Sequence, residues 1–114
     1  MNRSNCFYEI ERTEDTLRVI LNGEMDHHNA VILRTELDRL ISEERPKRFA
    51  IDLSGVGFMD SSGLGFVMGR YALLQRLGGE LVLENPNERI IKIFELAGLG
   101  RIVRIEGLKK EDVK

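Results

Sequence analysis

The feature that most constrains the fold is a regular alternation of short β-branched segments with longer amphipathic ones. Residues 7–12 and 16–21 are rich in aromatic and β-branched side chains and flank a short polar turn, which predicts a β-hairpin. Across residues 30–41 the apolar side chains recur at steps of three and four, which predicts an amphipathic helix ending before Pro46. The first 45 residues therefore predict two strands followed by a helix, as in an α/β protein.

The alternation continues to the end of the chain. Residues 49–53 predict a buried strand, and the apolar residues after Ser61 predict a second helix that stops at Gly78. Residues 80–84 and 102–105 predict two further strands. Alternating strands and helices favour a largely parallel sheet, to which the opening hairpin adds an antiparallel strand.

A third helix is predicted between the last two strands. Asn85 is interpreted as its cap, with Pro86 at the first helical position and Glu88 reaching back to the cap. Residues 108–114 could form only a short terminal helix. We therefore predict a single α/β domain over residues 1–114, with a mixed, mostly parallel sheet of four to five strands, three to four helices and the order β-β-α-β-α-β-α-β.

The composition restricts the partners and the compartment. Seventeen Lys and Arg oppose nineteen Asp and Glu, with both signs spread along the chain, so the basic face typical of a nucleic-acid-binding protein is not expected. The apolar runs are far shorter than the ~20 residues that span a bilayer, which excludes a membrane protein. Cys6 is interpreted as a small strand residue; with no signal-peptide pattern, this lone cysteine predicts a cytoplasmic protein.

The stretch FMDSSGLG at residues 58–65 marks a strand-to-helix junction, where functional groups of α/β domains gather. Ser61 and Ser62 are candidate helix caps. A serine here is also a candidate acceptor for phosphate, because the start of a helix tolerates a dianion. Gly63 and Gly65 would leave the backbone open to a closely approaching partner.

Two other kinds of site have weaker support. The hydrolase motif G-x-S-x-G fails at both serines, because Met59 and Asp60 stand where a glycine is needed. A metal site at Asp26 is unsupported, because the adjacent His27 and His28 cannot easily bind one ion together and no clustered ligands accompany them.

A nucleotide site is the alternative that stays open. Gly63, Gly65 and Gly69 approach a dinucleotide fingerprint, and Glu84 lies where a ribose-binding acid is expected. Nine residues separate Leu53, the end of the predicted strand, from Gly63, which is too many for the usual tight turn. A small nucleotide-binding protein or nucleotidase is therefore kept as an alternative function.

Three motifs resemble one family over nearly the whole chain. GEMDHH at residues 23–28, FMDSSGLG at 58–65 and IFELAGL at 93–99 resemble the STAS-domain anti-sigma factor antagonists, the first motif being particular to their sporulation branch. The resemblance implies a partner switch without a cofactor, not an enzyme. In this family the unphosphorylated antagonist binds an anti-sigma factor that is also an ATP-dependent serine kinase, and frees the sigma factor. The kinase then phosphorylates the antagonist, and a PP2C-type phosphatase restores it.

The resemblance also implies roles for individual residues. By motif, Ser61 is the phosphorylated serine, Ser62 is its neighbour and helix cap, and Asp26 meets a basic residue of the anti-sigma factor. The implied partner-binding surface comprises Asp26, Met59, Asp60, Ser61, Ser62, Gly63 and Leu64. The free chain is expected to be a monomer, and a STAS scaffold module in another signalling assembly is a further alternative.

Overall fold

A computed structural model of the chain describes residues 7–108, and the predictions for Cys6 and for a terminal helix within 109–114 lie outside these residues. Five strands form one sheet in chain order: β1 (Phe7–Arg12), β2 (Thr16–Met25), β3 (Arg48–Met59), β4 (Glu80–Glu84) and β5 (Arg104–Glu106). The helices between them are α1 (His27–Glu44), α2 (Ser61–Leu77), α3 (Glu88–Leu96) and the short 3-10 helix η1 (Leu99–Arg101). β1 is antiparallel to β2 and the other neighbours are parallel, which confirms the predicted fold class and element order.

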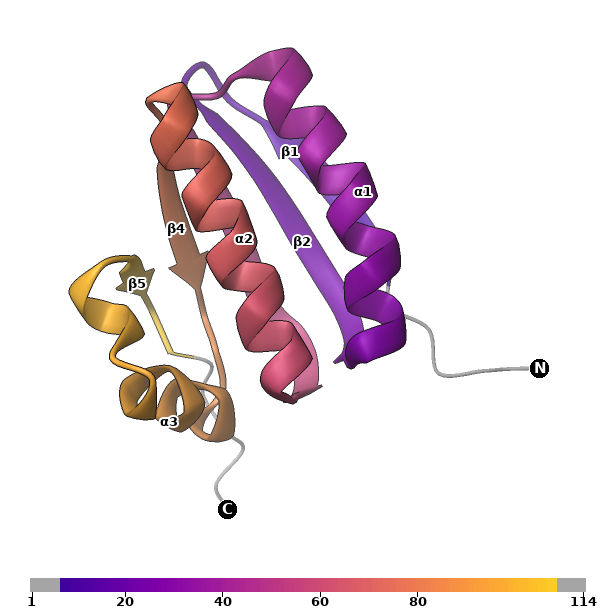
Figure 1. Ribbon diagram of the computed structural model, residues 1–114, viewed down its shortest axis with the longest axis vertical. Helices are drawn as coiled ribbons and strands as arrows, with labels where there is room; N and C mark the ends of the chain where they lie inside the picture. The colour runs from indigo at the N-terminus through magenta and orange to yellow at the C-terminus, as the bar shows by residue number, and fades with distance from the viewer. Residues whose placement is uncertain (1–6, 109–114) are drawn as a thin grey trace.

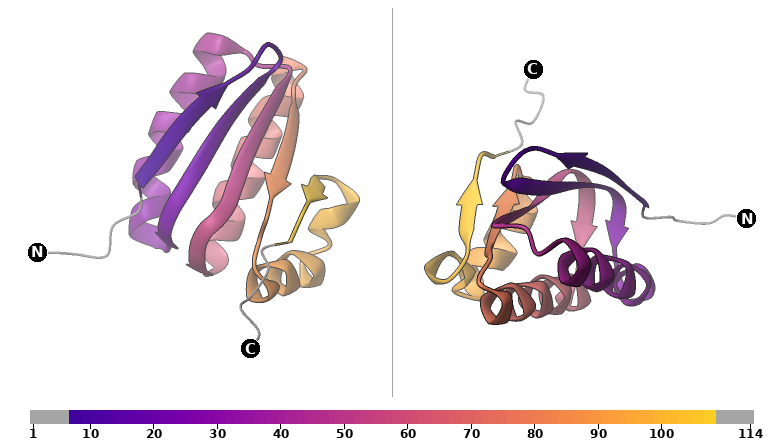
Figure 2. Two further views of the ribbon diagram at one scale, coloured as in Figure 1. Left: turned by 180° about the vertical axis from the view of Figure 1, so that it is seen from behind. Right: turned by 90° about the horizontal axis from the view of Figure 1, so that it is seen from above.

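The helices α1 and α2 lie side by side on one face of the sheet, whereas α3 and η1 lie beside β4 and β5 (Figure 1; Figure 2). Between the layers, Val19, Phe49 and Ile51 of the strands are fully buried, as is Leu37 of α1. Burial of each such side chain contributes roughly 1.5–3 kcal/mol. No helix in the described part of the chain is long and apolar enough to cross a membrane.

The two central strands are longer than the sequence pattern predicts. β2 continues beyond Leu21 to Met25 through Gly23, whose φ of 119° accompanies a shift in the pairing with β3. β3 continues beyond Leu53 to Met59, although β4 pairs only with its first half. From Gly23 to Met25, β2 pairs with β3 alone among the strands that the structure describes, so these two strands project past the rest of the sheet and end together.

The predicted start of the third helix is wrong by two residues. Asn85 has a left-handed backbone with φ 58°, and its N–H donates to the carbonyl of Glu106 at 2.8 Å. Asn87 is the actual cap and accepts from the N–H of Ile90 at 2.9 Å. Asn85 is unavailable as a cap because it closes the end of β4 against β5 in a left-handed conformation, whereas a cap residue takes extended backbone.

An arginine lies buried between α1 and α2. The Arg70 side chain is 5% exposed, and its Nε lies 2.8 Å from Oδ1 of Asp38 on α1. The Arg70 guanidinium also lies 5.2 Å from the centre of the Phe66 ring and donates to the Phe66 carbonyl at 3.2 Å. Desolvation by burial lowers the pKa of Arg70, and the charge of Asp38 opposes that effect. This ion pair joins α1 to α2.

Candidate functional site

The candidate site lies where β2 and β3 end and α1 and α2 begin. Met25 and Met59 are paired as the last residues of the two strands, and the N–H of Asp60 approaches the Met25 carbonyl at 3.5 Å. Each strand is followed at once by an aspartate and then a helix. The parallel pairing therefore places Asp26 and Asp60 side by side at one edge of the sheet.

Both aspartates cap a helix through their carboxylates. Asp26 accepts from the N–H of Asn29 at 2.9 Å. Asp60 uses one oxygen, Oδ1, to accept from the N–H of Ser62 at 2.8 Å and of Gly63 at 3.3 Å. Such caps satisfy amides that the first turn of a helix leaves unpaired, and their negative charge complements the helix dipole.

The two serines follow this cap rather than forming it. The prediction that Ser61 and Ser62 are helix caps is wrong, because β3 runs to Met59 and leaves Asp60 at the corner. Ser61 is the first residue of α2 and is exposed. Ser62 is half-buried, and its Oγ lies 3.5 Å from Nδ1 of His27.

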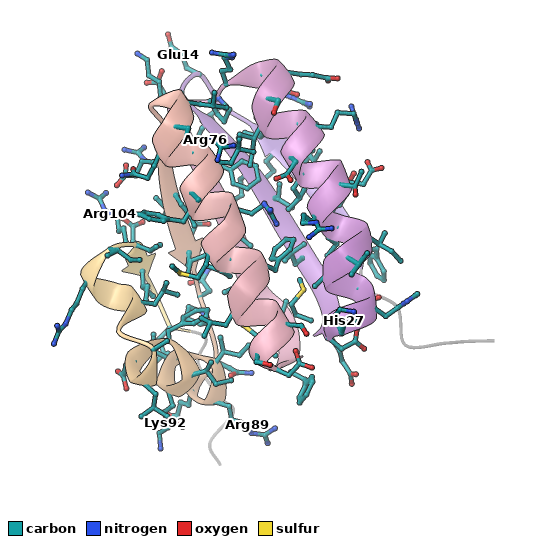
Figure 3. The ribbon with its side chains drawn as sticks, in the orientation of Figure 1. Glu14, His27, Arg76, Arg89, Lys92 and Arg104 are labelled. Carbon is teal, nitrogen blue, oxygen red and sulfur yellow. The ribbon has the colours of Figure 1, made fainter. Side chains whose placement is uncertain are left out.

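The structure brings His27 close to the serine turn (Asp60 to Gly63), a contact that the sequence did not indicate. His27 begins α1 at the same end of the molecule at which α2 begins (Figure 3). Within residues 7–108, no carboxylate accepts a hydrogen bond from the imidazole, so His27 and Ser62 lack the third group of a catalytic triad. The same residues contain no group of three or more His, Cys, Asp or Glu side chains that could hold a metal ion.

The predicted partner-binding residues divide into exposed and buried ones. Met59 is 4% exposed and Gly63 is buried, so neither offers a side chain to a partner. A Cβ atom on Gly63 would collide with Met59, which shows how closely α2 approaches β3 here. Leu64 is half-buried, and Phe58, which the sequence analysis did not select, is 46% exposed. No signal in the sequence indicated Phe58, because β3 has an extra residue against β2 at this point and the buried Val56 and Met59 do not follow strict alternation.

A hollow of about 290 Å³ separates the first turns of the two helices. Its lining comprises His27, Val31 and Arg34 of α1 with Ser62, Gly65 and Phe66 of α2, among other residues. The hollow combines the apolar side chains of Val31 and Phe66 with the cationic Arg34 and with His27, directly beside Ser62. The surface next to Ser62 is therefore concave rather than flat.

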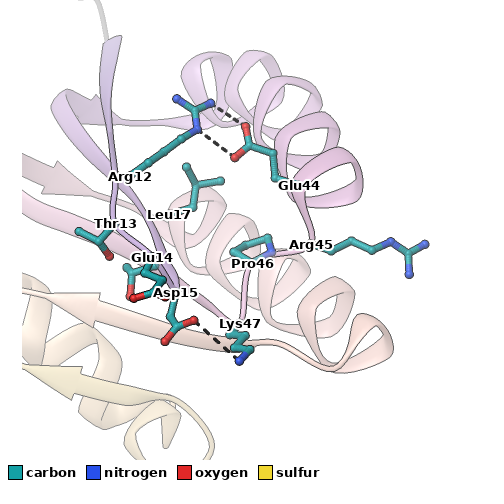
Figure 4. Close-up of a pocket in the computed structure, with 10 residues that line it drawn as sticks. Arg12, Thr13, Glu14, Asp15, Leu17, Glu44, Arg45, Pro46 and Lys47 are labelled. Carbon is teal, nitrogen blue, oxygen red and sulfur yellow. Dashed lines mark hydrogen bonds and ion pairs between the residues drawn. The ribbon is translucent and has the colours of Figure 1, made fainter.

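A hollow of about 280 Å³ at the opposite end of the sheet lacks these properties. Four of its charged side chains form two ion pairs: Arg12 with Glu44, and Lys47 with Asp15 at 3.8 Å (Figure 4). Hydrogen bonding to the Arg12 guanidinium lowers the pKa of the Glu44 carboxyl. These groups hold the strand turn against the end of α1.

The geometry of the glycines does not suit a nucleotide. Gly63 and Gly65 lie inside α2 rather than in a loop before it, since the helix begins at Ser61. The expected gap between Leu53 and Gly63 is absent, because β3 continues past Leu53 to Met59. Glu84 accepts two hydrogen bonds from Arg18, at 2.8 and 3.0 Å, on the face of the sheet away from α2. The residues of the supposed fingerprint are therefore not brought together.

The family is decided by a direct comparison. The model of the STAS domain matches residues 7–110. The chain belongs to the STAS domain family. The resemblance stated from the three motifs is thereby confirmed, and it covers this STAS domain from β1 to beyond β5.

Curated relatives of this STAS domain carry the names of antagonists. The anti-sigma F factor antagonist of Paenibacillus polymyxa is 35% identical over 101 residues, covering 89% of this chain and 86% of the relative. The anti-sigma-B factor antagonist of Bacillus subtilis is 34% identical over 110 residues, covering 96% and 99%.

This STAS domain resembles solved structures of SpoIIAA in its unphosphorylated and in its phosphorylated form. The anti-sigma factor antagonist SpoIIAA in its unphosphorylated form has a TM-score of 0.75 at 31% identity, covering 87% of each chain. The Bacillus cell fate determinant SpoIIAA in the phosphorylated form has a TM-score of 0.70 at 31% identity, covering 87% of this chain and 90% of that one.

Proposed function

We propose that this STAS domain is an anti-sigma factor antagonist, a regulatory binding protein rather than an enzyme. Its unphosphorylated form binds an anti-sigma factor that is also a serine kinase, and so releases a sporulation sigma factor. The observation that carries the proposal is the placement of the exposed Ser61 beside Asp26 by the paired ends of β2 and β3. The names of the relatives and of the SpoIIAA structures support it.

Phosphorylation of Ser61 is the proposed off switch. The kinase transfers the γ-phosphoryl group of ATP to Ser61 Oγ; a new O–P bond forms, the hydroxyl proton leaves and ADP is released. A PP2C-type phosphatase hydrolyses the ester and restores the serine. Exposure favours Ser61 over Ser62 as the acceptor, because the half-buried Ser62 hydroxyl faces His27. We place this cycle in the cytoplasm, where ATP and sigma factors are available.

The surface around Ser61 explains why a phosphate would weaken binding. Asp26 and Asp60 already bring negative charge to it, and Leu64 and Phe58 bring apolar area. A phosphoserine adds about −1.5 to −2 charges at neutral pH. Wrongly placed like charge in an interface costs several kcal/mol, and each 1.4 kcal/mol is a tenfold change in affinity. Met59 and Gly63, being buried, would act by supporting this surface from below.

The choice of a sporulation sigma factor depends on the first loop. The relatives include antagonists from both the sigma F and the sigma B systems at similar identity. Asp26, His27 and His28 form the motif that resembles the sporulation branch. Asp26 caps α1, and His27 and His28 are its first two residues. At this position they would contact the anti-sigma factor that binds around Ser61.

The test is phosphorylation by the anti-sigma kinase of the same organism with Mg-ATP, followed by mapping of the phosphate by fragment mass spectrometry. Ser61→Ala should abolish the modification, whereas the matched control Ser62→Ala should keep it. Binding to the kinase should be strong before modification and weak after it, and size-exclusion chromatography should show a free monomer. Absence of both binding and modification would reject the proposed function and leave only the STAS fold.

A further inference from the structure

The amides at the start of α2 are already occupied by a carboxylate. Oδ1 of Asp60 accepts from the N–H groups of Ser62 and Gly63 at 2.8 and 3.3 Å. These are the donors that a helix N-terminus would otherwise offer to a phosphate on its first residue. Ser61 occupies that first position. A phosphate on Ser61 and the carboxylate of Asp60 would therefore compete for the same two amides.

We propose that Asp60 keeps the phosphate of a modified Ser61 off the first turn of α2 and directs it outward into the partner surface. The inference rests on the proposed function in one respect, that Ser61 is the modified residue. Asp60 directly follows the buried Met59 and is the single residue between β3 and α2, so its carboxylate is in place before the phosphate arrives. Asp60 is thus a positioning residue that acts on the phosphate by like charge and by occupying its donors.

The two aspartates of the site differ in this respect. Asp26 brings the same charge to the same edge of the sheet, but its carboxylate is bonded to Asn29 in α1. It does not occupy the amides of α2. Removal of the charge at Asp26 therefore controls for a general change in the electrostatics of the surface, while the Asp60 carboxylate is the side-chain acceptor at Ser62 and Gly63.

Without the charge at position 60, the phosphate would turn inward. An asparagine or serine there remains a good helix cap, so α2 should form in the usual place. The phosphate, as the stronger acceptor, would then take the Ser62 amide from the neutral side chain. It would share the Gly63 amide with the backbone carbonyl of residue 60, which accepts from it at 3.0 Å. The dianion would be partly neutralised by its own helix and would oppose a partner less.

The first experiment needs no kinase. Phosphoserine is placed at position 61 by genetic encoding in the full chain, in Asp60→Asn, in Asp60→Ser and in Asp26→Asn, and amide resonances are recorded by ¹H–¹⁵N NMR. In the parent chain and in Asp26→Asn, the phosphate should leave the Ser62 and Gly63 resonances near their unmodified positions. In both Asp60 variants, it should move these two resonances strongly downfield. Equal downfield shifts in the parent chain, or none in the Asp60 variants, would overturn the inference.

The second experiment measures affinity for the anti-sigma kinase with and without phosphoserine at position 61. The loss of affinity caused by the phosphate should be about tenfold smaller in Asp60→Asn than in the parent chain, because hydrogen bonds now neutralise the dianion. Asp26→Asn should keep the loss of the parent chain, and an equal loss in all three would contradict the role of Asp60. If the phosphate changes no affinity, the proposed function fails, while the amide resonances still decide where the phosphate lies.

Discussion

A methyl group added at Gly63 and one added at Gly65 should change stability in opposite directions. Both glycines lie in the first turns of α2, two residues apart. A Cβ atom at Gly65 would meet nothing within 4 Å, whereas one at Gly63 would lie 2.8 Å from Cγ of Met25 and 3.1 Å from Sδ of Met59. Met25 is fully buried and Met59 is 4% exposed, so neither side chain can swing into solvent.

The two effects can be separated by magnitude. Alanine is favoured over glycine in a helix by about 1 kcal/mol, and this gain applies at both positions. Overpacking of a filled site costs typically 1–3 kcal/mol, and this loss applies only at Gly63. Gly65→Ala should therefore raise the free energy of unfolding by about 0.5–1 kcal/mol, and Gly63→Ala should lower it by about 1 kcal/mol.

Urea unfolding followed by far-ultraviolet circular dichroism measures both variants against the parent chain. The dependence of the free energy on urea should stay constant, so that the midpoints report stability alone. Gly69→Ala is a second control, since a Cβ there also meets nothing within 4 Å. A Gly63→Ala chain as stable as Gly65→Ala would show that the buried methionines move aside without cost, and would refute the close packing of α2 on the strand ends.

Three further changes test other parts of the structure. Asn87→Ala should lower the free energy of unfolding by about 1 kcal/mol in urea unfolding through loss of the α3 cap, and no loss would mean that Asn87 is not the cap. Asp38→Asn should cost about 1–3 kcal/mol in the same assay, because the buried Arg70 loses its charged partner; a neutral result would show that solvent replaces it. Glu44→Gln should reduce stability at neutral pH by removing the bond to Arg12, and the difference should vanish on acidification. The pKa of Glu44 is lowered on folding, so its contribution is present above the ordinary carboxyl pKa and lost as the pH falls through the folded value; a difference that persists at low pH would contradict this origin.

The order of strands and helices was predictable, because hydrophobic periodicity depends on nearby residues alone. The ends of the elements were not, because they depend on pairing between distant segments. β3 reaches Met59 only because β2 continues beside it to Met25, past a glycine that reads locally as a stop. The position of the α3 start likewise depends on Asn85, whose amide is bonded to β5.

The candidate site was found from its motifs, but its internal organisation was not. Asp60, Ser61 and Ser62 are all good capping residues, and the sequence cannot choose among them without the end of β3. The contact between Ser62 and His27 joins residues 35 positions apart and follows from the side-by-side helices. Burial of Met59 was equally hidden, because it depends on how closely α2 packs at Gly63.

The spatial order of the strands repeats their order along the chain, and this bears on how the protein is made. Each strand from β2 onward pairs with the strand that precedes it in the sequence, so no strand must be inserted later between two paired neighbours. Such a topology can be extended by one strand at a time as the chain leaves the ribosome. The paired ends of β2 and β3, which carry Asp60 and Ser61, can therefore form without the later pairing of β4 and β5.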